Sequence, residues 1–454
     1  MNRMMIYGMM VIGMIRRLYY RLQTFIRRFG LGTLLILAII ISVILSIALW
    51  RAPERNIKSV TRVDATKQLV AAKPFTDLYN FNQLMLNEAD GQQYMVIDYR
   101  PIADKITKRL RNWDVTFAGQ KKLSKQAYIA SLQHKNALVL ALPDAVPGAV
   151  IREKLHGMAD LPVNVGINRI RIPRAKPTSV WFYDDQQRRV YRYKVTRAVK
   201  TMINVRRPAT AVLATYRMNA ANKVVTDTLA PVSLRTYSYL MEAQSTNSYL
   251  SVLFRDGATP SAQRVGHEVT YSDGAIRQLK LNTMTGVASF NDYGVVGAHK
   301  TFHQRVQQGY KWLLHARQLP NNVYYFENQA QGRRLTYRLY VDGLPIFNQT
   351  TYGTVQIRQY DDQHQQVDFS QYTLQVPLPS DDKAKVDLAP SATIYKQLRT
   401  VGVTDNQIDN LSYGYRWVSD TTENVVTLSP EWYVEIDGEW NAVSDVLAIH
   451  QGGY

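Results

Sequence analysis

Few residues in this 454-residue chain have types and spacings that could support chemistry. His299 and His303 stand four positions apart on an expected helix, a spacing that can place two imidazoles on one metal ion. No obvious third ligand accompanies them, so two solvated histidines are the favoured interpretation. The chain has no phosphate-binding loop, zinc-protease or serine-hydrolase motif, and no cysteine. We therefore expect a non-enzymatic protein without a metal or cofactor.

Adjacent acidic pairs, such as Asp184-Asp185, are the other candidates for acid/base chemistry. Neighbouring residues on a strand point to opposite faces of the sheet, so such a pair does not place two carboxyl groups together. These pairs are expected in loops.

Aromatic residues are concentrated near the C terminus: Tyr413, Tyr415, Trp417, Trp432, Tyr433 and Trp440. Core packing and a partner surface both fit this composition, and core packing is favoured for most of them. Four of these residues form the candidate partner surface: Tyr413, Tyr415, Trp432 and Trp440.

The rest of the chain is organised around an uncharged apolar run at residues 31–50, LGTLLILAIIISVILSIALW. Its 20 residues make a helix of about 30 Å, the thickness of a bilayer's hydrocarbon core. The run is longer than a signal-peptide core, and no small-residue cleavage pattern follows Trp50. We predict a retained transmembrane helix.

The charge around this helix predicts its orientation. Six arginines and no acidic residue precede it, which places residues 1–30 in the cytoplasm and the large C-terminal body outside. The whole chain carries a formal charge of +19. An exported domain meets no nucleic acid, so the basic surface serves solubility or meets anionic wall polymers and lipid head groups.

Within the apolar run, Ala38, Ser42 and Ser46 recur every four residues. In lipid, small residues allow the backbone of a second helix to approach closely, and serine hydroxyls can bond across the contact. This face is a candidate for pairing between transmembrane helices, although alanine and serine also occur at such spacings by chance.

The rest of the chain predicts an α+β body of antiparallel sheets with packed helices. Abundant tyrosine and frequent Asp-Gly turns favour strands, and helical periodicity appears at residues 102–113, 147–156, 248–254, 298–319 and 392–401. A hairpin is expected at residues 82–98, a buried strand at 137–142, and C-terminal strands at 411–418, 425–428 and 431–436. We divide the body into three domains: 51–173, 174–297 and 298–454.

The sequence resembles the YycH family, membrane-anchored regulatory proteins of the WalK/YycG two-component system in low-GC Gram-positive bacteria. The resemblance rests on the order of elements behind the apolar run and on short motifs: INRIRIP at 167–173, VWFYD at 180–184, YLSVLFRD at 249–256, GYRW at 414–417 and LSPEWYV at 428–434. The last stretch is also similar to the related YycI proteins.

The resemblance implies a regulator that acts with a YycI-like partner on the WalK/YycG sensor histidine kinase and controls cell-wall metabolism, partly through transmembrane helices. It brings no catalytic residues. The alternative is an ectodomain that binds an anionic wall polymer, with the helix as a passive tether.

Overall fold

The computed structural model describes residues 39, 41–43, 73–174, 178–198, 205–254, 259–274, 276–294, 300–316, 322–348, 351–379, 385–420 and 424–451. Residues Leu69–Tyr454 form one unit, separate from Met1–Gln68. Within the described part of the chain, no helix combines the length and apolar character that crossing a membrane requires. Apart from Ile39 and 41–43, the predicted span at 31–50 lies outside the described residues.

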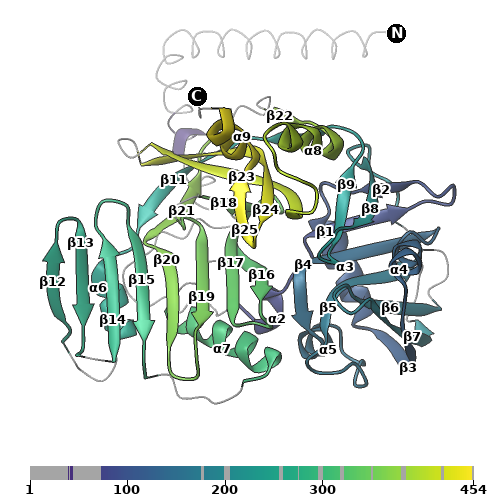
Figure 1. The fold of residues 1–454 in the computed structure, drawn as a ribbon, viewed down its shortest axis with the longest axis horizontal. Coiled ribbons are helices and arrows are strands. Elements are labelled where there is room, and N and C mark those ends of the chain that lie inside the picture. Colours follow the sequence, from purple (N-terminus) through teal and green to yellow (C-terminus); the bar gives the residue numbers. More distant parts are fainter. Residues whose placement is uncertain are drawn as a thin grey trace, which may run out of the picture. The chain divides into compact units, whose positions relative to one another are not determined.

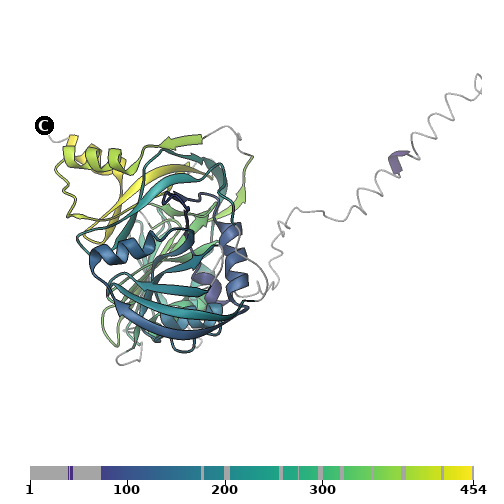
Figure 2. The same cartoon turned by 90° about the vertical axis from the view of Figure 1, so that its right-hand side faces the viewer.

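The first sheet contains nine of the described strands, all paired antiparallel (Figure 1). In spatial order they are β3 (Trp113–Lys122), β7 (Arg189–Ala198), β6 (Ser179–Asp184), β5 (Gly166–Pro173), β4 (Ala137–Pro147), β1 (Gln83–Asn87), β2 (Gln93–Met95), β8 (Val212–Met218) and β9 (Val224–Thr228). Its helices are α2 (Phe75–Leu78), α3 (Arg100–Leu110), α4 (Lys125–Leu132) and α5 (Gly148–Leu155). Figure 2 shows blue helices against the strands of this sheet.

The second sheet contains fourteen of the described strands. Twelve follow one another as β12 (Ser261–Val265), β13 (Glu268–Ser272), β14 (Arg277–Asn282), β15 (Val287–Asp292), β20 (Gln365–Ser370), β19 (Thr354–Gln359), β17 (Arg334–Val341), β18 (Leu344–Phe347), β23 (Ile408–Asp420), β24 (Val425–Ile436), β11 (Tyr237–Ala243) and β21 (Tyr372–Pro377). β16 (Val323–Gln329) pairs with β17, and β25 (Glu439–Ala442) pairs with β24. The β18–β23 pair is parallel.

A short ribbon of β10 (Val232–Arg235) and β22 (Lys385–Leu388) lies beside these sheets. The remaining helices are α6 (Thr246–Leu253), α7 (Phe302–His315), α8 (Ser391–Thr400) and α9 (Val443–Gln451). The α+β class with mostly antiparallel sheets is confirmed.

Local sequence explains the elements that were predicted correctly. The hairpin forms as β1 and β2, with Met85 opposite Met95. The apolar run at 137–142 is the wholly buried first half of β4, at the middle of the first sheet. The helix expected at 298–319 is α7, where Thr301 and Gln304 form a capping box.

Two predictions about the sheets were wrong. Strands 425–428 and 431–436 are one continuous strand, β24, which passes through Pro430 opposite Tyr415. The domain boundaries at 173 and 297 divide paired strands: β5 bonds to β6 across the first, and β15 bonds to β20 across the second. Composition marks connecting segments, whereas pairing between distant strands decides which sheet a strand belongs to. In this chain, β9 is the last strand of the first sheet and β11 is the first strand of the second.

The two sheets share one apolar core. Tyr79, next to α2, packs on Tyr325 of β16 with ring centroids 5.0 Å apart, and its hydroxyl lies 3.4 Å from that of Tyr337 on β17. The Tyr99 hydroxyl donates to the Gly343 carbonyl at 2.8 Å. Asp342 and Gly343 both have positive φ, as the tight turn between β17 and β18 requires.

Candidate functional site between the two sheets

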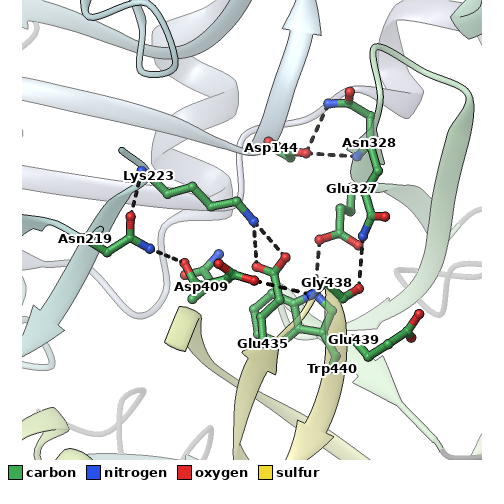
Figure 3. Close-up of polar contacts among 12 residues, drawn as sticks. Asp144, Asn219, Lys223, Glu327, Asn328, Asp409, Glu435, Gly438, Glu439 and Trp440 are labelled. Carbon is green, nitrogen blue, oxygen red and sulfur yellow. Dashed lines mark hydrogen bonds and ion pairs between the residues drawn. The ribbon is translucent and has the colours of Figure 1, made fainter. Parts of the chain in front are cut away.

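A cleft of about 120 Å³ lies where the sheets meet. Its charged lining residues come from segments that are distant in sequence: Asp144 of β4, Arg169 of β5, Lys223 just before β9, and Glu327 of β16. Trp432 of β24 and Trp440 of β25 complete this wall, and Glu435 of β24 lies beside Lys223 (Figure 3). We call this region the intersheet cleft.

The clearest polar link across the intersheet cleft is the ion pair of Lys223 and Glu435. The Lys223 Nζ donates to both carboxylate oxygens of Glu435, at 2.7 and 2.8 Å. Burial lowers the pKa of Lys223, but the attraction and hydrogen bonds of Glu435 more than offset this, so the pKa lies above its ordinary value. Lys223 is therefore charged at neutral pH.

The segment before Lys223 is fixed by Asn219. Its side-chain oxygen accepts from the Lys223 backbone N–H at 2.8 Å, and its amide donates to the Asp409 carbonyl at 2.5 Å. One asparagine thus shapes the turn between β8 and β9 and bonds to the start of β23 in the other sheet.

Asp144 makes a second link. It accepts from the Asn328 backbone N–H at 2.9 Å and from the Asn328 side-chain amide at 3.0 Å. Burial raises the pKa of Asp144 to about 6, although these hydrogen bonds favour the charged form.

Glu327 has the most strongly raised pKa among the carboxyl groups of the intersheet cleft. It is 7% exposed and accepts from the Trp440 indole N–H at 3.3 Å. Burial raises its pKa to about 8, and repulsion from Glu435 and Asp144 adds to the shift. Glu327 therefore carries a proton at neutral pH.

Three carboxyl groups, one lysine and Arg169 thus share a confined space between the sheets. A raised carboxyl pKa also suits a general acid, but no serine, threonine or histidine side chain of the described residues hydrogen-bonds to Glu327 or Asp144. Nor do the described residues gather three acidic or histidine side chains in a metal-binding arrangement. The arrangement joins the sheets through a proton-sensitive contact.

Sequence reasoning missed these charged residues because no motif connects them. Glu327 and Glu435 do carry a local signal: each interrupts an apolar strand, within YYFEN and WYVEI. An acidic residue inside such a run is costly to bury unless a partner lies opposite. That partner comes from a distant strand, so its identity cannot be read from spacing.

The predicted partner surface divides in two. Tyr415 and Trp432 are only 1% and 4% exposed; Tyr415 packs on Tyr237, and the Trp432 indole donates to the Ala389 carbonyl at 3.0 Å. Burial removes Tyr415 from the surface, so its assignment to a partner contact was wrong. Trp432 is buried but lines the intersheet cleft, and its role in partner binding stays a prediction. Tyr413 and Trp440 are half-buried and line the intersheet cleft, and their role in partner binding stays a prediction.

The other predicted residues have mixed outcomes. Ala38 and Ser46 of the helix-pairing face lie outside the described residues, as does His299; Ser42 is helical and exposed. Asp185 lies in the turn after β6, as expected for a loop residue, but it is buried, pairs with Arg169 and accepts from the Tyr128 hydroxyl at 2.8 Å.

Residues 227–452 match the family model described as YycH protein, C-terminal domain. This range begins in β9 and covers the whole second sheet. The fold is similar to the crystal structure of YycH from Bacillus subtilis, with a TM-score of 0.63 and 13% sequence identity, over 82% of this chain and 97% of that one. No curated protein matches the sequence. The expected similarity to YycI stays a prediction.

Proposed function

Since the chain belongs to the YycH family, we propose that it is a membrane-anchored, non-enzymatic regulator of the WalK/YycG sensor histidine kinase. In this proposal it works with a YycI-like partner and controls cell-wall metabolism. The match of residues 227–452 to the family model carries the proposal. The family is regulatory, so membership points to the histidine kinase system rather than to catalysis.

The intersheet cleft supports a non-enzymatic role. Its lysine pairs with Glu435, and its other two carboxyl groups accept hydrogen bonds from Asn328 and Trp440. Groups engaged in this way hold strands together and leave little freedom to bind and convert a substrate. The half-buried Tyr413 and Trp440 at the cleft are candidates for contact with the partner ectodomain.

The topology that we propose has residues 1–30 in the cytoplasm, one span at 31–50, and the two-sheet body outside. The positive charge before the apolar run supports this orientation. Ile39, Ile41 and Val43 in the run are each about half exposed, which places apolar side chains where lipid or another helix can cover them. Regulation would pass through the helix face of Ala38, Ser42 and Ser46.

The test replaces this small-residue face with leucine in the full-length protein: Ala38→Leu, Ser42→Leu and Ser46→Leu together. Close helix contacts in lipid contribute about 0.6–2 kcal/mol, so co-purification of the kinase should fall several-fold. A coupling of about 1–3 kcal/mol between sites is enough to change kinase output measurably, so autophosphorylation in reconstituted vesicles should shift as well.

The matched control is Ile40→Leu with Ile44→Leu, which changes the opposite side of the same predicted helix without adding bulk. Unchanged co-purification and kinase output in the triple variant, with normal membrane insertion, would exclude this helix face as the point of contact. The wall-polymer alternative predicts this result, because a passive tether tolerates such changes.

A further inference from the structure

A second, larger hollow of about 520 Å³ is lined by residues of α2, α3 and α5 and by Tyr324 of β16. Its charged lining is strongly basic, with five cationic and two acidic side chains: Lys73, Arg100, Lys108, Arg111 and Lys154 against Asp77 and Asp104. We call it the basic groove. None of the contacts described above uses it.

Helical periodicity explains why one wall of the basic groove is so basic. The lining residues of α3 and its C-cap are Arg100, Ala103, Asp104, Thr107, Lys108 and Arg111, which recur at intervals of three and four. Residues at these intervals share one helix face. Lys105 lies on the same helix but does not line the groove.

Lys154 forms the floor of the basic groove. It is only 2% exposed, and its Nζ donates to the Thr76 carbonyl at 3.0 Å and to the Asn80 side-chain oxygen at 2.8 Å. Both of these acceptors are neutral. Burial lowers the pKa of Lys154 to about 8, because the charged form is desolvated. A bound anion would offset the free energy lost by this desolvation.

Tyr324 holds two of the cations close together at its ring. Lys73 Nζ lies 3.3 Å from the centroid of the Tyr324 ring, and the Arg100 guanidinium lies 4.9 Å from it. Burial, followed by repulsion from Arg100, lowers the pKa of Lys73 to about 7. Cations thus converge on the hollow from α3, from α5 and from the residue that leads into α2.

We propose that the basic groove binds a phosphodiester group of a slender anionic polymer. The hollow can admit a thin flexible chain, whereas a flat membrane surface cannot enter it. Cations that approach from three elements suit the tetrahedral oxygens of phosphate better than a planar carboxylate, and arginine adds bidentate contacts.

The chain's own segment before the groove is a poor occupant. Residues 51–72 contain Arg51, Arg55, Lys58, Arg62 and Lys67 against only Glu54 and Asp64, so their charge has the same sign as the groove. A polymer on the outer side of the membrane matches the charge. This choice of ligand rests on the proposed extracytoplasmic location of the body.

The experiment titrates full-length protein in phosphatidylcholine nanodiscs with poly(glycerol phosphate) at low and high salt. We expect saturable binding that weakens with salt. Arg100→Gln and Lys154→Met should each lower the affinity about tenfold or more, as expected for hydrogen bonds to charged groups. Lys105→Gln should leave it unchanged. Arg100→Gln keeps the test decisive if Lys154→Met fails to fold, which circular dichroism reports.

Three results would overturn the proposal: no binding at low salt, an equal loss in Lys105→Gln, or equally tight binding of polyglutamate of matched charge. Co-flotation with phosphatidylglycerol vesicles in place of polymer binding would also overturn it. The titration contains no kinase, so its failure leaves the regulatory proposal standing, and failure of the kinase test leaves the polymer site standing.

Discussion

The ion pair between the sheets gives the sharpest prediction, because its two partners differ in exposure. The Glu435 side chain is 2% exposed, whereas that of Lys223 is 43% exposed. Removing the lysine by Lys223→Met leaves a buried carboxylate close to Glu327 and Asp144. Removing the acid by Glu435→Gln leaves a lysine that water can reach.

The two variants should therefore differ in stability. Loss of one partner from a buried pair costs about 3–5 kcal/mol when the other charge stays buried, and we expect Lys223→Met near the lower end. Glu435→Gln keeps a hydrogen-bond acceptor and strands no buried charge, so its cost should be about 1 kcal/mol. Lys223→Met should thus be the more damaging by about 2 kcal/mol.

The assay is urea unfolding of the full-length protein in a non-ionic detergent, followed by tryptophan fluorescence at pH 7.5. Trp432 and Trp440 line the intersheet cleft and report on its opening. The double variant Lys223→Met with Glu435→Gln should recover part of the loss, because no unpaired charge remains. Equal costs for the two single variants, or a larger cost for Glu435→Gln, would refute this account of the pair.

Two further predictions concern the same region. The pKa of Glu327 in the folded state lies near 8, above its ordinary value of 4.5, so between these values the folded state binds a proton that the unfolded state has lost. The contribution of Glu327 to stability is therefore greatest below about pH 4.5 and falls as the pH rises to about 8, by up to about 1.4 kcal/mol per pH unit. Glu327→Gln should flatten this dependence in urea titrations at pH 5 and 8.5, and an unchanged slope would contradict it. Gly414→Ala would place a Cβ 2.5 Å from the Pro345 carbonyl and should cost about 1–3 kcal/mol, whereas Ser412→Ala on the same strand should be nearly neutral in the same assay.

Much of the fold was predictable because it follows from local patterns. The β1–β2 hairpin forms around Ala89-Asp90-Gly91, and α3 and α7 form from apolar stripes with polar residues outside. The turn at Asp437-Gly438 has positive φ at both residues, as its sequence indicates. Each of these depends on residues that are neighbours in the chain.

The predictions that failed depend on distant partners. The first strand after residue 173, β6, pairs back onto β5, and β15 pairs with β20 more than 70 residues later, so domain boundaries drawn from composition were wrong. Tyr415 has the residue type of a partner surface, but its strand lies inside the second sheet and its side chain is buried. Whether an aromatic side chain is core or surface is decided by what packs on it.

The sequence by itself determined the apolar run, the basic segment before it, the α+β class and the family resemblance, because these depend on residue type and local order. The tertiary structure alone decided which charges meet. Lys223 and Glu435 are 212 positions apart, and the cations of the basic groove come from three separate elements. Electrostatic energy depends on distance and burial, and both are set only when the strands and helices have packed.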